Sequence, residues 1–179
     1  MGVARPRVGV AVLTTGDRMP ELRALLDSVA AQDEPAARIV VVGNGCALPG
    51  LPDGVVGVEL AENLGVSGGR NVAWRRLREY GDVDVLVDLD DDGLLVDTDV
   101  VRRTADLYET RPGARLGIVG FRIADEAGGT QRRHVPRLRA ADPSGGAWSR
   151  RSSAAPTPCR WRCWNRRAAG RTRSSSPTS

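Results

Sequence analysis

Three adjacent carboxylates are the residues of this chain that could most readily do chemistry. Asp90, Asp91 and Asp92 directly follow an apolar run at 83–89. Alternate side chains of a strand point to opposite faces, so Asp90 and Asp92 are expected on one side and Asp91 on the other. Their mutual repulsion at the end of an apolar core would be offset by a divalent cation, which typically binds one or two carboxylates together with water and phosphate oxygens. The spacing therefore predicts Mg²⁺ or Mn²⁺ at Asp90 and Asp92, with an acidic, solvated turn as the simpler alternative.

A second candidate segment is rich in glycine and runs from Asn63 to Asn71. It contains Gly69 and Arg70 and is followed by a helical pattern that reaches about Tyr80. Glycines ahead of a helix let backbone amides approach a phosphate or a ribose, and a helix N-terminus favours an anion. The guanidinium group of Arg70 also suits phosphate. The segment is expected to bind phosphate, and a plain glycine loop with a helix cap is the alternative.

Strands and helices alternate along the chain around these two segments. The expected strands are short runs rich in Val, Leu and Ile, at 7–15, 39–42, 55–60, 83–89 and 116–123. The expected helices show apolar residues at helical spacing and lie between Pro20 and Pro35, from Asn71 to Tyr80, and at 98–110. This alternation predicts an α/β fold in which a mostly parallel sheet has helices on both faces. Such sheets bind ligands at the carboxyl ends of their strands, where the three carboxylates are expected.

Charge is distributed unevenly along the chain. All 22 acidic residues lie at or before Asp142, whereas basic residues continue after it. The net charge of +4 therefore comes from residues 143–179, and the preceding part is net acidic. We expect the basic balance to say little about partners of the folded part, and no nucleic-acid partner is expected.

The apolar and cysteine patterns exclude several classes of protein. No apolar stretch approaches the roughly 18 residues that a membrane span needs. The apolar run at 8–13 is too short for a signal peptide, so no integral membrane segment and a cytoplasmic location are expected. Cys46, Cys159 and Cys163 are too few and wrongly spaced for a zinc site or a disulfide framework.

The order of these segments over residues 7–140 resembles the family 2 glycosyltransferases, which have the GT-A fold. The matching segments are Thr14 to Arg18, Leu25-Leu26-Asp27-Ser28-Val29 with Gln32, Val41-Val42-Gly43-Asn44-Gly45, Asn63-Leu64-Gly65 with Gly69-Arg70-Asn71, and Asp90-Asp91-Asp92.

The resemblance implies a Rossmann-like GT-A nucleotide-binding half over residues 1–142. Its activity would be transfer of a sugar, with inversion, from a nucleotide-sugar donor to a hydroxyl group of an unknown acceptor. The implied nucleotide-sugar-binding residues are Thr14, Arg18, Asn44, Asn63, Gly69, Arg70, Asn71, Asp90 and Asp91. The implied ligands of Mg²⁺ or Mn²⁺ are Asp90 and Asp92.

Two residues depart from the pattern of the family. Many members carry Asp where this chain has Asn44, and the position of Asp88 is usually apolar. One alternative is a haloacid-dehalogenase-like phosphatase, because the segment from Asp90 to Leu95 resembles its D-x-D-G motif. In that family the motif lies near the N-terminus and a later lysine supports the phosphate, whereas this chain has no lysine. A non-catalytic nucleotide-binding remnant is a further alternative.

Residues 143–179 differ in composition from the rest of the chain. They are rich in Ser, Pro, Ala and Arg without periodic apolar positions, which predicts disorder. Stray tryptophans and the lack of acids indicate a frameshift or truncation after about residue 146. Read one frame away, the segment 170–179 can become Trp-Pro-Asp-Ala-Phe-Phe-Phe-Ala-His-Glu, similar to the late acidic catalytic segment of the family. Because inverting transfer needs a general base and no acid follows Asp142, the catalytic residue is unknown and we expect impaired transfer.

Overall fold

Six strands form one sheet in the computed structural model, which describes residues 4–109, 118–121, 123 and 162–165. The strands are β1 (Val8–Thr14), β2 (Arg38–Asn44), β3 (Val55–Leu60), β4 (Val85–Asp90), β5 (Ile118–Gly120) and β6 (Arg162–Asn165). Their order across the sheet is β3-β2-β1-β4-β6-β5. The first four strands are parallel, whereas β6 is antiparallel to both β4 and β5. The predicted α/β fold with a mostly parallel sheet is confirmed.

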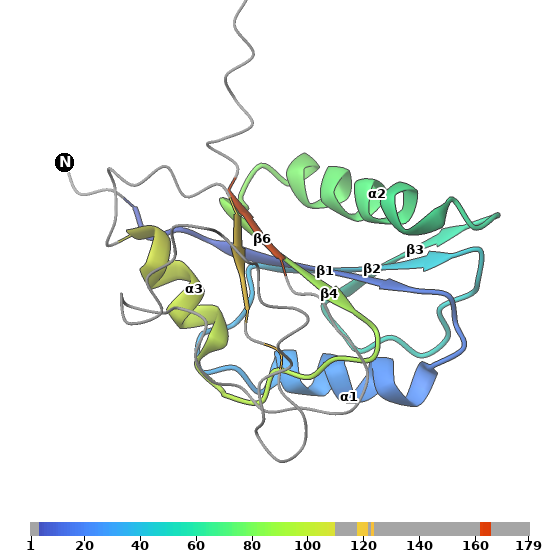
Figure 1. Cartoon of the computed structure of the whole chain (residues 1–179), viewed down its shortest axis with the longest axis horizontal. Helices are drawn as coiled ribbons and strands as arrows, with labels where there is room; N and C mark the ends of the chain where they lie inside the picture. Colours follow the sequence, from blue (N-terminus) through green and yellow to red (C-terminus); the bar gives the residue numbers. More distant parts are fainter. Residues whose placement is uncertain (1–3, 110–117, 122, 124–161, 166–179) are drawn as a thin grey trace, which may run out of the picture.

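Helices cover both faces of this sheet (Figure 1). They are α1 (Met19–Ala30), α2 (Gly65–Glu79) and α3 (Val100–Glu109). Helices α1 and α3 pack on one face and α2 on the other. All seven residues of the central strand β1 are therefore buried, with Val10 and Val12 in one core and Ala11 and Leu13 in the other. No helix of the described residues is long and apolar enough to cross a membrane.

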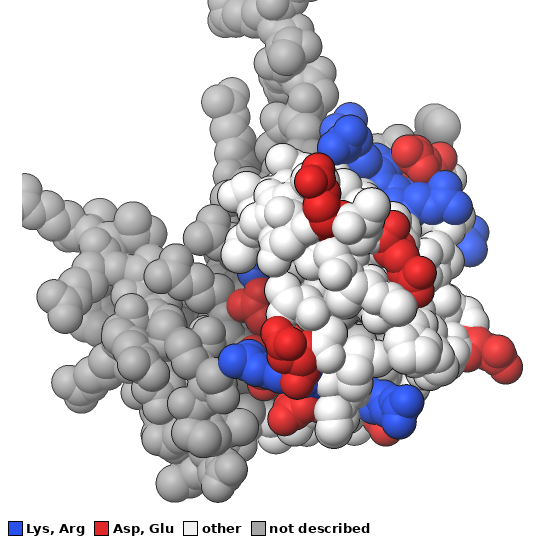
Figure 2. Space-filling model, turned by 90° about the vertical axis from the view of Figure 1, so that its right-hand side faces the viewer, with Lys and Arg blue, Asp and Glu red and all other residues white. Residues whose placement is uncertain are grey.

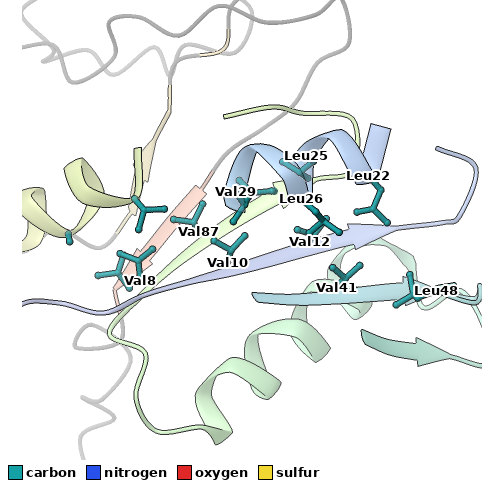
Figure 3. Close-up of a cluster of buried hydrophobic side chains, with 14 of the residues drawn as sticks. Val8, Val10, Val12, Leu22, Leu25, Leu26, Val29, Val41, Leu48 and Val87 are labelled. Atoms are coloured by element: carbon teal, nitrogen blue, oxygen red, sulfur yellow. The ribbon is translucent and has the colours of Figure 1, made fainter. Parts of the chain in front are cut away.

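Helix α1 shows how the sequence pattern produces the larger core. Pro20 lies in its first turn, where a missing backbone N–H costs nothing, and apolar residues then recur every three or four positions. Figure 3 shows these side chains directed at the sheet, over Val10 and Val12 of β1 and Val87 of β4. The buried residues of the helix are Leu22, Leu25, Leu26 and Val29.

The glycine-rich segment lies inside helix α2 rather than ahead of it. The helix begins at Gly65, so the prediction of a glycine loop followed by a helix after Asn71 is wrong. A Cβ atom at Gly69 would overlap Cδ1 of Leu13 and lie 3.3 Å from Cγ of Asn44. Gly69 thus lets the helix approach the ends of β1 and β2, and this packing outweighs the low helix propensity of glycine.

Strand β6 belongs to the segment for which we predicted disorder. Its backbone pairs antiparallel with β4, in a register that places Asp88 opposite Arg162. Residues 162–165 nevertheless form a strand, because pairing with the free side of β4 is a long-range contact that local composition does not reveal, and the disorder of residues 143–179 as a segment stays a prediction. The other residues of 143–179 lie outside the described part, as do 110–117 at the expected end of α3 and start of β5.

Two polar side chains, one in the last turn of α1 and one two residues after the helix, hold the connection between β4 and α3. Oγ of Ser28 accepts a hydrogen bond from the backbone N–H of Leu95 at 3.1 Å. Nε2 of Gln32 donates to the carbonyl oxygen of Asp97 at 2.9 Å, and its Oε1 accepts from the backbone N–H of Val101 at 3.1 Å. Gln32 is buried, so its amide satisfies groups that water does not reach. The chain that follows the three carboxylates is thereby fixed to α1.

Replacing Gln32 by leucine should test this connection. Gln32→Leu leaves the backbone N–H of Val101 and the carbonyl of Asp97 without their partner, which should lower the free energy of unfolding by about 1–3 kcal/mol. Urea denaturation measures the change. Glu79→Gln is the control, because the Glu79 side chain is 61% exposed and its loss should change the free energy by less than about 0.5 kcal/mol. Equal midpoints for Gln32→Leu and the wild type would contradict the assigned role.

Candidate functional site

The predicted site residues gather where the parallel strands end. Strand β1 ends at Thr14, β2 at Asn44 and β4 at Asp90. The chain passes from β1 to β2 on one side, whereas β4 lies on the other side of β1. Open α/β sheets bind ligands at such a reversal of strand order. Figure 2 looks onto this edge, where acidic and basic side chains lie among uncharged ones.

Asp91 joins the ends of β1 and β4. Oγ1 of Thr14 donates a hydrogen bond to Oδ2 of Asp91 at 2.6 Å, and both residues are buried. The Thr14 hydroxyl also accepts from the backbone N–H of Gly16 at 3.0 Å. Burial raises the pKa of the Asp91 carboxyl above its ordinary value, and the hydrogen bond from Thr14 opposes that rise. Asp91 therefore connects the ends of β1 and β4; we use the word crevice for the place between these strand ends.

Arg18 lies on the α1 side of the carboxylates. Its Nη1 forms an ion pair with Oδ2 of Asp92 and lies 3.8 Å from Oδ1 of Asp91. The Arg18 side chain is 48% exposed, whereas that of Asp92 is 9% exposed. One solvated guanidinium group thus neutralises part of the charge of two neighbouring carboxylates.

Arg70 lies on the α2 side of the carboxylates and is largely buried. Its Nε is 2.8 Å from Oδ2 of Asp88, and its Nη2 forms an ion pair with Oδ1 of Asp90. The exposed fractions of the side chains are 15% for Arg70, 3% for Asp88 and 30% for Asp90. One guanidinium group therefore connects the buried carboxylate of Asp88 with the partly exposed carboxylate of Asp90.

These contacts differ from the expected alternation of the three carboxylates. Asp90 and Asp92 were expected on one side, with Asp91 opposite. The structure pairs Asp90 with Arg70 and directs both Asp91 and Asp92 toward Arg18. The reason is that β4 ends at Asp90, so the alternation of a strand extends back to Asp88 but not forward to Asp92.

Asn44 and Asn63 together hold the start of α2. Nδ2 of Asn44 donates to Oδ1 of Asn63 at 2.8 Å, and Oδ1 of Asn44 accepts from the backbone N–H of Leu64 at 2.9 Å. Oδ1 of Asn63 also accepts from the backbone N–H of Gly65 at 2.8 Å. Asn44 is buried, so these contacts place the N-terminus of α2 beside the strand ends. That both residues contact a nucleotide remains a prediction.

Asn71 lies apart from the other predicted site residues. It is exposed and lines a hollow of about 240 Å³ along the outer side of α2. The other residues of this hollow are Trp74, Arg75 and Arg78. The buried residues Gly69, Ala73 and Leu77 mark the side of α2 that faces the sheet.

Two residues near the crevice were not predicted as site residues. Asp88 was noted as unusual in the sequence, yet only the structure shows that it binds Arg70. Cys46 donates from Sγ to the carbonyl oxygen of Thr14 at 3.8 Å, and burial raises the pKa of its thiol. Its place after Gly45 carries no sequence signal for this contact, since it depends on how the ends of β1 and β2 pack.

The carboxylates suit a hard divalent cation only in part. Among the described residues, no three His, Cys, Asp or Glu side chains converge as a metal site. Asp90 and Asp92 offer carboxylate oxygens, the ligands that Mg²⁺ and Mn²⁺ prefer. The donor set fits a cation that takes one or two ligands from the protein and the remainder from water and phosphate oxygens.

Solved structures resemble the chain over most of its length, although no protein-family model and no curated protein matches it. TarS 1–349 from S. aureus superimposes with a TM-score of 0.52 and 20% identity over 73% of this chain and 38% of that chain, and its complex with UDP gives the same values. The mannosyltransferase PcManGT from Pyrobaculum calidifontis, solved with GDP-Man and Mn²⁺, superimposes with a TM-score of 0.50 and 23% identity. That match covers 68% of this chain and 36% of PcManGT.

The chain spans little more than a third of the length of these solved structures. By this similarity, the chain has the fold of the GT-A glycosyltransferases.

Proposed function

We propose that the described part of the chain is the donor-binding half of a family 2 glycosyltransferase, which binds a nucleotide sugar together with Mg²⁺ or Mn²⁺. The observation that carries the proposal is the cluster of acidic and basic side chains at the ends of β1 and β4. It contains the carboxylates of Asp88, Asp90, Asp91 and Asp92 and the guanidinium groups of Arg18 and Arg70.

The charges of this cluster support a divalent cation and an anionic ligand together. With every group charged, four carboxylates and two guanidinium groups leave an excess of two negative charges. One divalent cation balances that excess. A bound diphosphate then meets the cation and two arginines, which present forked donors to phosphate oxygens. The cation, when bound, stabilises negative charge on the departing diphosphate.

The residues of the crevice divide into three proposed roles. Asp90 and Asp92 hold the metal, and Arg18 and Arg70 contact the diphosphate. Thr14 and Asn44, at the ends of neighbouring strands, flank the nucleobase. PcManGT, solved with GDP-Man and Mn²⁺, and TarS, solved with UDP, support a nucleotide as the ligand class.

Transfer to an acceptor is proposed to be impaired in this chain. The acids beside the crevice already contact arginine or Thr14, and no acid follows Asp142. Inverting transfer needs a general base that takes the proton of the acceptor hydroxyl. A chain that binds the donor without such a base would hold the nucleotide sugar but transfer its sugar slowly.

Calorimetry with UDP, TDP and GDP should show metal-dependent binding. At least one of these nucleotides is expected to bind about tenfold or more tightly with Mn²⁺ than without it. Asp92→Ala should abolish the difference, because it removes a proposed ligand of the cation. A folded wild-type chain that binds none of the three in a metal-dependent manner would refute the proposal.

Asp91→Asn is the matched control for that measurement. Asparagine retains an oxygen that can accept the hydrogen bond from Thr14 at the position of Oδ2. Because Asp91 holds the strand ends together and is not a proposed metal ligand, the variant should keep most of the metal dependence. An equal loss of metal dependence in Asp91→Asn and Asp92→Ala would show that the proposal assigns the metal to the wrong carboxylates.

A transfer assay at high protein concentration should detect little product. Loss of a general base typically lowers the rate about 10²- to 10⁴-fold, so nucleotide release from UDP-sugars and GDP-sugars should remain near background with simple sugar acceptors. A glycosyltransferase of known activity, run in parallel, shows that the assay works. Robust turnover by this chain would show that a base is present and that the proposed impairment is wrong.

A further inference from the structure

The proposed metal ligands are each in contact with a guanidinium group of the same chain. Oδ1 of Asp90 pairs with Nη2 of Arg70, and Oδ2 of Asp92 pairs with Nη1 of Arg18. A cation that binds the same carboxylate oxygens must displace the guanidinium groups or share these oxygens with them. Sharing weakens the charge-assisted hydrogen bonds of the arginines. In this structure one oxygen of each proposed metal ligand is paired with a guanidinium group.

Arg70 is held at this place by a second carboxylate. Its Nε lies 2.8 Å from Oδ2 of Asp88, a buried residue on the same face of β4 as Asp90. This contact involves a different nitrogen from the one that meets Asp90. Rotation of the planar guanidinium group about the Cδ–Nε bond can therefore release Asp90 while Nε stays beside Asp88.

We infer that Arg18 and Arg70 are internal counter-cations that compete with the metal for Asp92 and Asp90 and are released toward the diphosphate when the metal binds. The inference rests on the proposed function of the site. Asp88 is then a positioning residue, because it retains Arg70 beside the place where the diphosphate would lie.

Metal and diphosphate should consequently bind with positive coupling. The metal alone must break two ion pairs, which leaves Arg70 with Asp88 and Arg18 with the more distant Asp91 as anionic partners. The diphosphate alone would have to draw the arginines away from the carboxylates, leaving these carboxylates unbalanced. When both bind, the metal would balance the carboxylates and the diphosphate would accept the released guanidinium groups, so each ligand raises the affinity for the other by the same factor.

Titration of Mn²⁺ alone separates competition from simple phosphate binding. Arg70→Met removes the competitor at Asp90 and should tighten binding of Mn²⁺ by about tenfold, the effect of one charge-assisted hydrogen bond. Arg18→Met should tighten it by about threefold, because an ion pair of a half-exposed arginine is screened by water. Electron paramagnetic resonance of free Mn²⁺ measures both affinities without nucleotide or turnover.

Arg75→Met is the matched control for both variants. It makes the same substitution on α2, at a residue that lines the outer hollow and donates to the carbonyl oxygen of Asn71. Its affinity for Mn²⁺ should equal that of the wild type. Because Arg70→Met leaves buried Asp88 without its ion pair, the double variant Asp88→Asn/Arg70→Met removes that charge as well, and it should show the same tighter binding.

The second measurement is the factor by which Mn²⁺ raises the affinity for UDP or GDP. This factor should be about tenfold smaller in Arg70→Met than in the wild type, since the released guanidinium group is missing. Unchanged or weaker binding of Mn²⁺ alone by Arg18→Met and by the folded Arg70 variant would overturn the inference, even where nucleotide binding depends on metal. Loss of metal-dependent nucleotide binding in the wild type would instead overturn the proposed function.

Discussion

The need to balance four carboxylates at one end of a buried strand governs the arrangement of this molecule. As whole residues, Asp88 is 2% exposed and Asp91 is 8% exposed, so neither can rely on water to stabilise its charge. Thr14 donates to Asp91, and Arg70 contacts Asp88. The ends of β1 and β4 and the start of α2 must therefore keep their relative positions for the acidic cluster to exist.

This constraint connects the two helical layers through the sheet. Arg18 directly precedes α1 on one face, whereas Arg70 lies within α2 on the other. Both guanidinium groups reach carboxylates at the end of β4, and the connection that follows is held by Ser28 of α1 and by Gln32 just after it. A ligand that changes the partners of these arginines acts on contacts between the sheet and both layers. Under the proposed function, ligand binding would therefore be coupled to the packing of the fold.

Local patterns predicted the fold well because both faces of the sheet are covered. Continuous runs such as 39–42 and 55–60 become parallel strands, and the apolar spacing after Pro20 becomes α1. The same patterns failed where a long-range contact decides. Gly69 lies in a helix because its missing side chain admits Leu13, and 162–165 form a strand because β4 offers a backbone partner. The positions of Thr14, Asn44 and the three carboxylates followed from strand ends, but their partners did not, since Arg18 and Arg70 approach from separate elements.

The carboxylate of Asp88 in β4 is better explained by the proposed site than by the stability of the fold. An apolar residue at a buried strand position would pack against α2 without any cost of removing charge from water. A buried ion pair contributes little or nothing to stability compared with such a residue, because desolvation of both charges offsets their attraction. The pair with Arg70 does keep beside this carboxylate a guanidinium group that also meets Asp90. A strand that needed only to fold would gain nothing from this arrangement, whereas the proposed donor site would gain a cationic group beside its anionic ligand.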